Sequence, residues 1–282
     1  MRIALFSDIH GKFLLPFKLA ALYQEETGNR IDLILQCGDM GAYPDIHNLD
    51  KATVKHARSD RDELGFHDDF LHADPLIAAF LDKLNIPMIC VRGNHEDHDF
   101  LDRLEKESDA ARFPIDAYGR VFVCKSGHRQ EFRAGDVTLL FAGVGRIGDR
   151  KGRSEKRFIQ DFEREQLRRL HKENEVFDVL ITHDKDNSGD QGYGMPEIRE
   201  LLDKVLFHYH FYGHTGQPFT QQTDSNGITQ SVKIKELEFG ADGILPAGCM
   251  VLLQKDAAGN LQMEVVSQKL SNRLAKHNWR FA

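Results

Sequence analysis

Short apolar runs alternate along this chain with longer stretches in which apolar and charged residues mix. Apolar runs of about four to eight residues are typical of buried strands, and longer mixed stretches are typical of amphipathic helices. The sequence therefore predicts strands at 2–7, 31–37, 86–91, 119–124, 136–142, 177–182 and 207–212. It predicts helices at 13–26, 74–84, 97–107, 155–175 and 196–206. Strands and helices that alternate in this way indicate an α/β protein.

The pattern after residue 218 changes to strands and turns, with apolar segments at 232–239 and 249–254. No repeat and no linker rich in Pro, Gly or Ser divides the chain, so we expect a single domain that spans residues 1–282. A polar insertion near residues 42–73 interrupts it. We expect this insertion to form a lid that carries specificity, and the alternative is a solvated helical excursion. Its histidines are His47, His56, His67 and His72.

Composition and charge narrow the class of protein. The chain has 44 acidic and 37 basic side chains, and its formal charge of -7 disfavours a large nonspecific contact with nucleic acid. No apolar stretch is long enough to cross a bilayer, and residues 1–8 enter a strand too early for a signal peptide. The four cysteines are scattered without a C-x-x-C pair, which favours reduced, buried thiols over a zinc knuckle. We therefore expect a cytoplasmic protein without a membrane partner.

Five of the predicted strands are each followed by a side chain that can bind a metal ion. Open α/β sheets bind ligands outside the carboxyl ends of their strands. A single Asp or Asn there is typical of a turn, and a single His is usually structural. Side chains of this kind after five separate strands favour a common site. Glycine directly precedes three of these residues, which suits a sharp bend. The residues are Asp8, His10, Asp39, Asn94, His95, His183 and His214.

The chemistry of this set suits divalent transition metals. Carboxylate, imidazole and amide-oxygen ligands together favour Mn²⁺, Fe²⁺ or Zn²⁺ over Ca²⁺. A shared carboxylate with ligands on either side is what a two-metal site needs to clamp a phosphoryl group. The sequence thus predicts a pair of divalent ions at the strand ends.

The motifs DIH, GD, GNHE, a lone His after a strand, and GHTG follow one another between residues 8 and 216. In this order they resemble the calcineurin-like metallophosphoesterases. The resemblance implies two packed mixed β-sheets flanked by helices, a four-layer sandwich. It also implies a dinuclear centre in which a metal-bound hydroxide hydrolyses phosphate esters, as a phosphatase or a phosphodiesterase. The implied substrate is a phosphorylated small molecule, a nucleotide or a nucleic acid ester.

The resemblance also implies a role for each site residue. Asp8 and His10 correspond to ligands of the first metal, and Asp39 corresponds to the carboxylate that bridges both. His95 corresponds to the general acid, or electrostatic helper, at the leaving-group oxygen. The implied ligands of the second metal are Asn94, His183 and His214.

The chain departs from the family pattern in the last motif. That motif is commonly G-H-x-H, and its second histidine is Gly216 here. The first metal site is therefore expected to be weak or completed by water. The stretch GDMGAYPD lacks the Asp-Arg-Gly continuation of Ser/Thr protein phosphatases, so a small-molecule or nucleic-acid phosphoesterase is the stronger expectation.

Two other interpretations are open at the level of sequence. The formal G-x-G-x-x-G at residues 143–148 suggests an NAD-type enzyme, although no apolar helix follows it directly. The substitution at Gly216 suggests a scaffold or binding protein that has lost catalysis.

Several neighbouring residues also have two interpretations. Asp184 either orients His183 or caps a loop, and Arg92 either contacts phosphate or is solvated. The basic run at 146–157 either receives outer phosphates of the substrate or is a solvated surface.

Overall fold

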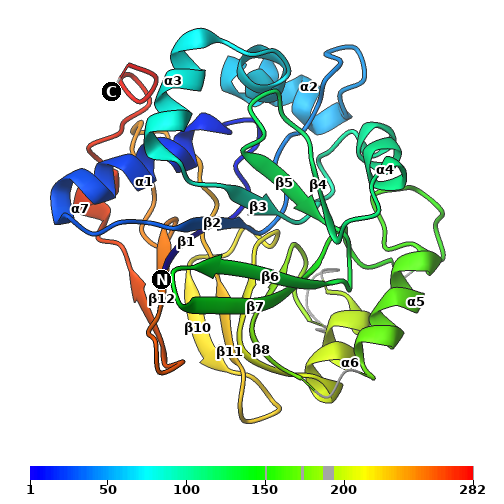
Figure 1. The fold of residues 1–282 in the computed structure, drawn as a ribbon. Coiled ribbons are helices and arrows are strands. Elements are labelled where there is room, and N and C mark those ends of the chain that lie inside the picture. The colour runs from blue at the N-terminus through cyan, green and yellow to red at the C-terminus, as the bar shows by residue number, and fades with distance from the viewer. Residues whose placement is uncertain (150, 173–174, 187–193, 282) are drawn as a thin grey trace.

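The computed structural model describes residues 1–149, 151–172, 175–186 and 194–281, and in them strands form two sheets that pack face to face. Helices α1 and α3 lie on the outer side of the first sheet, and helices α5 and α6 lie on the outer side of the second (Figure 1). The layers are therefore helix, sheet, sheet, helix. This arrangement confirms the expected α/β class and the four-layer sandwich.

The strand order places the first strand of the chain in the interior of its sheet, beside the middle strand. Among the described residues the first sheet has seven strands, in the order β13 (Leu261–Val265), β12 (Val251–Lys255), β1 (Arg2–Phe6), β2 (Leu33–Gln36), β3 (Met88–Cys90), β5 (Val121–Cys124) and β4 (Arg112–Pro114). The second has six, in the order β10 (Thr220–Thr223), β11 (Gln230–Lys233), β9 (Leu206–Tyr212), β8 (Val176–Thr182), β7 (Val137–Val144) and β6 (Arg129–Ala134).

Parallel pairing dominates the centre of each sheet. Strands β1, β2, β3 and β5 run parallel to one another, as do β7, β8, β9 and β11. The carboxyl ends of parallel neighbours lie at the same edge of a sheet, so residues that follow these strands can meet there.

The helices connect and cover the strands. Their bounds are α1 (Leu14–Thr27), α2 (Lys51–Ala57), α3 (Pro75–Leu84), α4 (His98–Glu107), α5 (Asp161–Leu170), α6 (Pro196–Lys204) and α7 (Gln268–Ser271). Two short helical turns, η1 (Arg61–Leu64) and η2 (Phe66–Phe70), lie between α2 and α3. None of the helices in the described ranges has the length and apolar character that a bilayer span requires.

Apolar side chains form a continuous layer between the two sheets. Strands buried on both faces read as apolar runs, and β1, β2 and β8 have this character. Ile3, Leu35, Phe141 and Ile181 are fully buried members of this layer. Each such side chain is expected to contribute about 1.5–3 kcal/mol by its burial. The layer holds the carboxyl ends of β1–β3 against those of β8 and β9.

Some sequence predictions differ from the structure. The helix expected at 155–175 begins at Asp161, because the Glu163 carboxylate accepts a hydrogen bond from the Gln160 backbone N–H and fixes the start there. Residues 173 and 174 of that prediction lie outside the described residues. The short strands β4 and β6 were not expected, since β6 mixes charged and apolar residues without a clear period. The run at 232–239 leaves its strand after Lys233.

The polar insertion 42–73 folds into helix α2 and the turns η1 and η2. The side chain of Asp50 caps α2 by accepting hydrogen bonds from the N–H groups of Ala52 and Thr53. Phe66 and Phe70 of η2 are buried against Phe13. The insertion is thus anchored on the first sheet's helical layer, and its role as a lid stays a prediction.

Candidate metal centre

The predicted metal-binding residues follow the carboxyl ends of five parallel strands. Asp8 and His10 come after β1, Asp39 after β2, Asn94 after β3, His183 after β8 and His214 after β9. Four of them have a positive φ, between 40° and 65°, which is unusual for residues other than glycine: Asp8, His10, Asp39 and His214. Such backbone conformations cost free energy and cluster at functional sites.

The structure brings these side chains together from both sheets. Among the described residues, two groups have ligand atoms that all lie within 4.8 Å of one another. One group is Asp8, His10 and Asp39, and the other is Asp39, His183 and His214. Asp39 belongs to both, so its carboxylate lies between them. Each group could hold a metal ion, and Asp39 is common to both.

Asn94 extends the second group. Its Oδ1 atom lies 3.0 Å from Nε2 of His183, and its backbone N–H donates to Oδ1 of Asp39 at 2.7 Å. The amide oxygen of Asn94 therefore lies beside the imidazole nitrogen of His183. The donor set of carboxylates, imidazoles and one amide oxygen fits a borderline divalent ion.

The tautomer of His183 is set by its second ring nitrogen. Nδ1 lies 3.0 Å from the carbonyl oxygen of Cys37 and donates to it, which leaves Nε2 directed at Asp39 and Asn94. Asp184 instead accepts backbone hydrogen bonds from Gly148, Lys185 and Gly194. Asp184 is therefore a loop cap, and the Cys37 carbonyl orients the histidine.

In the metal-free protein His183 and Asp39 shift each other's pKa. Burial lowers the pKa of His183, but the Asp39 charge and hydrogen bond outweigh it and raise this pKa to about 10. In the same way, burial raises the pKa of Asp39, and His183 holds it well below its usual range. A buried carboxylate kept ionised by cationic neighbours is suited to receive a metal ion in place of a proton.

Two glycines let the ligand loops approach each other closely. A Cβ atom at Gly93 would overlap Asp39, and one at Gly213 would overlap the side chains of Ser7 and Asp8. Neither glycine has a positive φ. The glycines before Asn94 and His214 are thus needed for close approach and not for a left-handed bend.

Glu96 holds the loops that carry Asp39 and Asn94. Its buried carboxylate accepts hydrogen bonds from the N–H groups of Met40, Ala42 and Gly93. Burial and the Asp39 charge raise the pKa of Glu96 to about 7. Three backbone donors on one carboxylate fix the spacing between the β2 and β3 loops.

Asp50 is a site residue that the sequence analysis did not identify. Its Oδ2 atom lies 2.7 Å from Nδ1 of His95 and also accepts the hydroxyl of Tyr43. Burial lowers the pKa of His95, but the Asp50 hydrogen bond and the Asp39 charge raise it to about 9. His95 is therefore cationic at neutral pH in the metal-free protein. Its ring lies beside that of His10, with centroids 5.7 Å apart.

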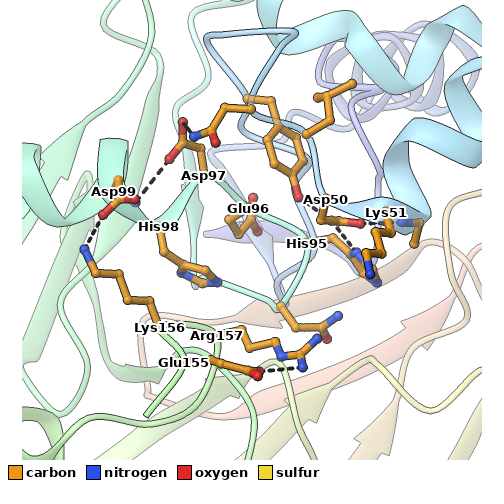
Figure 2. Close-up of a pocket in the computed structure, with 15 residues that line it drawn as sticks. Asp50, Lys51, His95, Glu96, Asp97, His98, Asp99, Glu155, Lys156 and Arg157 are labelled. Atoms are coloured by element: carbon orange, nitrogen blue, oxygen red, sulfur yellow. Dashed lines mark hydrogen bonds and ion pairs between the residues drawn. The ribbon is translucent and has the colours of Figure 1, made fainter.

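A cleft of about 770 Å³ opens beside His95 (Figure 2). The insertion forms one wall, which includes Asp50 and Lys51, and the segment before α5 forms the other, which includes Lys156 and Arg157. Lys156 pairs with Asp99 and Asp102, and Arg157 pairs with Glu155. The basic run predicted at 146–157 thus reaches the cleft through its last residues, and its residue 150 lies outside the described residues.

Arg92 does not face this cleft. Its guanidinium is 2% exposed and donates to Asp102 at 2.6 Å and to Glu105. Arg146 is fully buried and also pairs with Asp102 and with Glu163. Arg92 therefore ties α4 to the sheet end, and Arg146 ties both α4 and α5 to it. Neither of the alternatives for Arg92, phosphate contact or solvation, describes it.

The glycine-rich stretch 143–148 lacks the context of a dinucleotide site. It spans the end of β7 and a loop, and the next helix, α5, begins only at Asp161. A Cβ atom at Gly145 would crowd the backbone of Arg92, so this glycine serves loop packing. Among the described residues, no helix begins directly after the stretch to receive a pyrophosphate, and the NAD-type interpretation is not supported.

Comparison with known proteins gives a family match and solved structures of similar fold. The family described as calcineurin-like phosphoesterase matches residues 1–218. One crystal structure covers 94% of this chain and 99% of its own, with a TM-score of 0.52 at 15% identity. The structure of TT1561 from Thermus thermophilus covers 94% and 99%, with a TM-score of 0.49 at 17% identity. No curated protein matches the chain.

Proposed function

Because the chain belongs to the calcineurin-like phosphoesterase family, we propose that it hydrolyses phosphate esters at a dinuclear centre built on Asp39. The chain is a metallophosphoesterase, a phosphoric ester hydrolase that depends on bound metal. The observation that carries the two-ion proposal is the pair of ligand groups that share the Asp39 carboxylate.

The proposed ligands divide between two ions. The first ion is held by Asp8, His10 and Asp39, and the second by Asp39 together with the remaining residues, Asn94, His183 and His214. When bound, two divalent ions neutralise charge on a phosphoryl group and lower the pKa of water. Mn²⁺, Fe²⁺ and Zn²⁺ all match the donor set.

His95 is proposed to act at the leaving-group oxygen. Its ring borders both the large cleft and the smaller one that contains His10. A cationic imidazole stabilises negative charge that develops on a departing alkoxide and can donate its proton to it. Asp50 holds the ring through Nδ1, so Nε2 is the nitrogen left to face the substrate.

The proposed substrate is a small phosphorylated molecule. The cleft beside His95 is large enough for an organic leaving group, and Lys51, Lys156 and Arg157 offer cations to an anionic one. Carboxylates of Asp50, Asp97 and Asp99 line the same cleft, which disfavours the dense phosphate charge of a nucleic acid. We therefore rank a phosphorylated metabolite or nucleotide above a polymer.

The test is hydrolysis of p-nitrophenyl phosphate and of its bis-ester with added Mn²⁺, together with metal analysis. We expect turnover with about two ions per chain. Asp39→Asn is expected to abolish turnover and the binding of two ions, because this carboxylate would touch both ions. Full ion occupancy without turnover on any ester would instead favour the scaffold interpretation. The relative rates on the mono- and diester decide between phosphatase and phosphodiesterase.

The proposal includes a location in the cytoplasm. Its support is that Cys37, Cys90, Cys124 and Cys249 are all free and buried, as expected in a reducing compartment. Cell fractionation tests this location.

A further inference from the structure

We propose that Glu238 is a protein ligand of the first ion. The inference rests on the proposed function and adds a residue to its metal centre. Asp8, His10 and Asp39 offer three ligand atoms, and ions such as Zn²⁺ take at least four ligands. The first site therefore has room for a further ligand from the protein.

The loop after β9 leaves a gap at Gly216, and another segment of the chain passes beside it. Gly216 has no side chain, and a Cβ atom built there would meet nothing within 4 Å. The segment that follows β11 runs along this gap, since Nζ of Lys235 donates to the carbonyl oxygen of Gly216 at 3.0 Å.

The same segment is also fixed to the strand end that carries Asp8. The backbone N–H of Leu237 donates to the carbonyl oxygen of Ser7 at 3.0 Å, and the Leu237 side chain is fully buried. Residues 235–237 are thus held between Gly216 and the residue before Asp8. Glu238 comes next in the chain, at the entrance to the first group of ligands.

The carboxylate of Glu238 lies near one member of that group, His10. Its Oε1 atom lies 3.8 Å from Nε2 of His10, which is too long for a hydrogen bond. Two ligands of one ion, each about 2.0–2.2 Å from it, lie about 3–4 Å apart. The observed separation therefore suits an ion between them. The side chain of Glu238 is 47% exposed, so its rotamer can adjust to the ion without loss of core packing.

Glu63 lines the same small cleft with His10 and Glu238, but its charge has another partner. It lies 3.6 Å from the ammonium of Lys12, and both side chains are almost fully buried. Removal of Glu63 would leave the Lys12 cation buried beside Asp60 alone. Glu238 is therefore the carboxylate of this cleft that is able to turn toward an ion.

The test is Mn²⁺ binding measured by calorimetry on the full chain with the variants Glu238→Gln and Glu238→Ala. We expect one of the two sites to weaken at least about tenfold in both variants, and Glu238→Asp to recover part of the affinity. Asp242→Asn is the matched control, because its carboxylate lies on the same segment and, among the described hydrogen bonds, accepts only from the Ile244 N–H. The control is expected to bind as the wild type does.

A purely orienting role for Glu238 would give a different result. Glutamine keeps an oxygen that can accept from His10, so Glu238→Gln would then bind both ions within twofold of the wild type, and this outcome overturns the inference. Crystals soaked in Zn²⁺ give an independent readout. Anomalous scattering is expected to place the first ion about 2.0–2.2 Å from a Glu238 oxygen, and a separation beyond hydrogen-bond distance overturns the inference.

Failure of this inference is distinguishable from failure of the proposed function. Two ions bound, hydrolysis lost in Asp39→Asn, and unchanged binding in Glu238→Gln would overturn the role of Glu238 alone. A wild-type chain that binds no second ion would overturn the dinuclear centre and this inference with it.

Discussion

At the scale of single residues, the site depends on contacts between segments that are distant in the sequence. His95 and Asp50 are separated by 45 residues and by the whole of α2 and α3. The hydrogen bond between them fixes the ring and favours its protonated form. Asp50 is thus a positioning residue for the group proposed at the leaving-group oxygen.

Replacement of Asp50 by Asn is expected to lower kcat about 10- to 100-fold, because outer partners of an active-site group have effects of this size. The pH profile gives a second readout. Under the proposed role the protonated form of His95 is the competent one, so activity is expected to fall as pH rises through its pKa. Loss of the Asp50 charge lowers this pKa and moves the alkaline limb to lower pH.

The control is Asp45→Asn, in the same insertion, whose carboxylate accepts only the His47 backbone N–H among the described contacts. Its rate and pH profile are expected to match the wild type. An Asp50→Asn enzyme with an unmoved alkaline limb would contradict the role of the pair.

That the candidate metal ligands lie close together could be predicted from the sequence because each is coded locally. An apolar run followed by Asp8 or by His183 marks a strand end, and parallel strands bring their ends together. Asp50 and Glu238 could not be predicted in this way. Both lie in polar or irregular segments that have no periodic pattern of apolar residues. Their proposed roles arise from tertiary contacts with His95 and His10.

At the scale of elements, the C-terminal segment braces the insertion. Trp279 is 1% exposed, and its Nε1 donates to Asp62 at 3.0 Å. Arg280 bonds to Asp62 at 2.7 Å and to Asp69 at 2.8 Å. The turns η1 and η2, which belong to the insertion with Asp50, are thus held by the end of the chain.

Replacement of Trp279 by Ala is expected to lower the free energy of unfolding by about 3–5 kcal/mol, because a buried indole leaves a large cavity. Urea denaturation measures this loss. Hydrogen exchange is expected to rise first in residues 61–70, which the segment contacts. Trp279→Phe keeps most of the apolar volume and is expected to cost about 1–2 kcal/mol; an equal loss in both variants would contradict a packing role.

The elements show where sequence patterns succeed and fail. The bounds of α1 and α3 agree with the prediction within two residues, because their C-terminal positions, Gly28 and Asn85, adopt the left-handed conformation typical of helix ends. Helix α5 is shorter than predicted, since an amphipathic charge pattern continues on both sides of it. The edge strand β4 has three residues, too few for a period to be read.

At the scale of the whole molecule, two buried neutral histidines make stability depend on pH. Burial lowers the pKa of His98 to about 3, with a contribution from Arg146, and burial lowers the pKa of His210 to about 3. Histidines of the unfolded chain take up protons below about pH 6.5. At these two positions the unfolded state therefore binds more protons between pH 6.5 and pH 3, and their contribution to stability falls as pH falls through this window. The raised pKa values of His95 and His183 act in the opposite direction in the metal-free protein, because their contribution is lost as pH rises above 6.5.

The expected loss at pH 5 is about 2 kcal/mol for each of these histidines relative to pH 8. Urea denaturation across pH 4–8 measures it. His210→Gln is expected to remove the contribution of His210 to this acid sensitivity, whereas His208→Gln, at an exposed position of the same strand, is expected to change it little. If the free energy of unfolding depended on pH equally in the wild type and in His210→Gln, burial of a neutral His210 would not be a source of the acid sensitivity.

The proposed ligands come from both sheets, with Asp8, Asp39 and Asn94 on one side and His183 and His214 on the other. An ion bound to both sets would act as a cross-link between halves that otherwise meet through apolar side chains. Ligands that bind only the folded state add to its stability by mass action. Depletion of the ions by a chelator would then lower the free energy of unfolding and weaken the contact between the two sheets. A cell short of the metal would lose the protein itself to proteolysis as well as its activity.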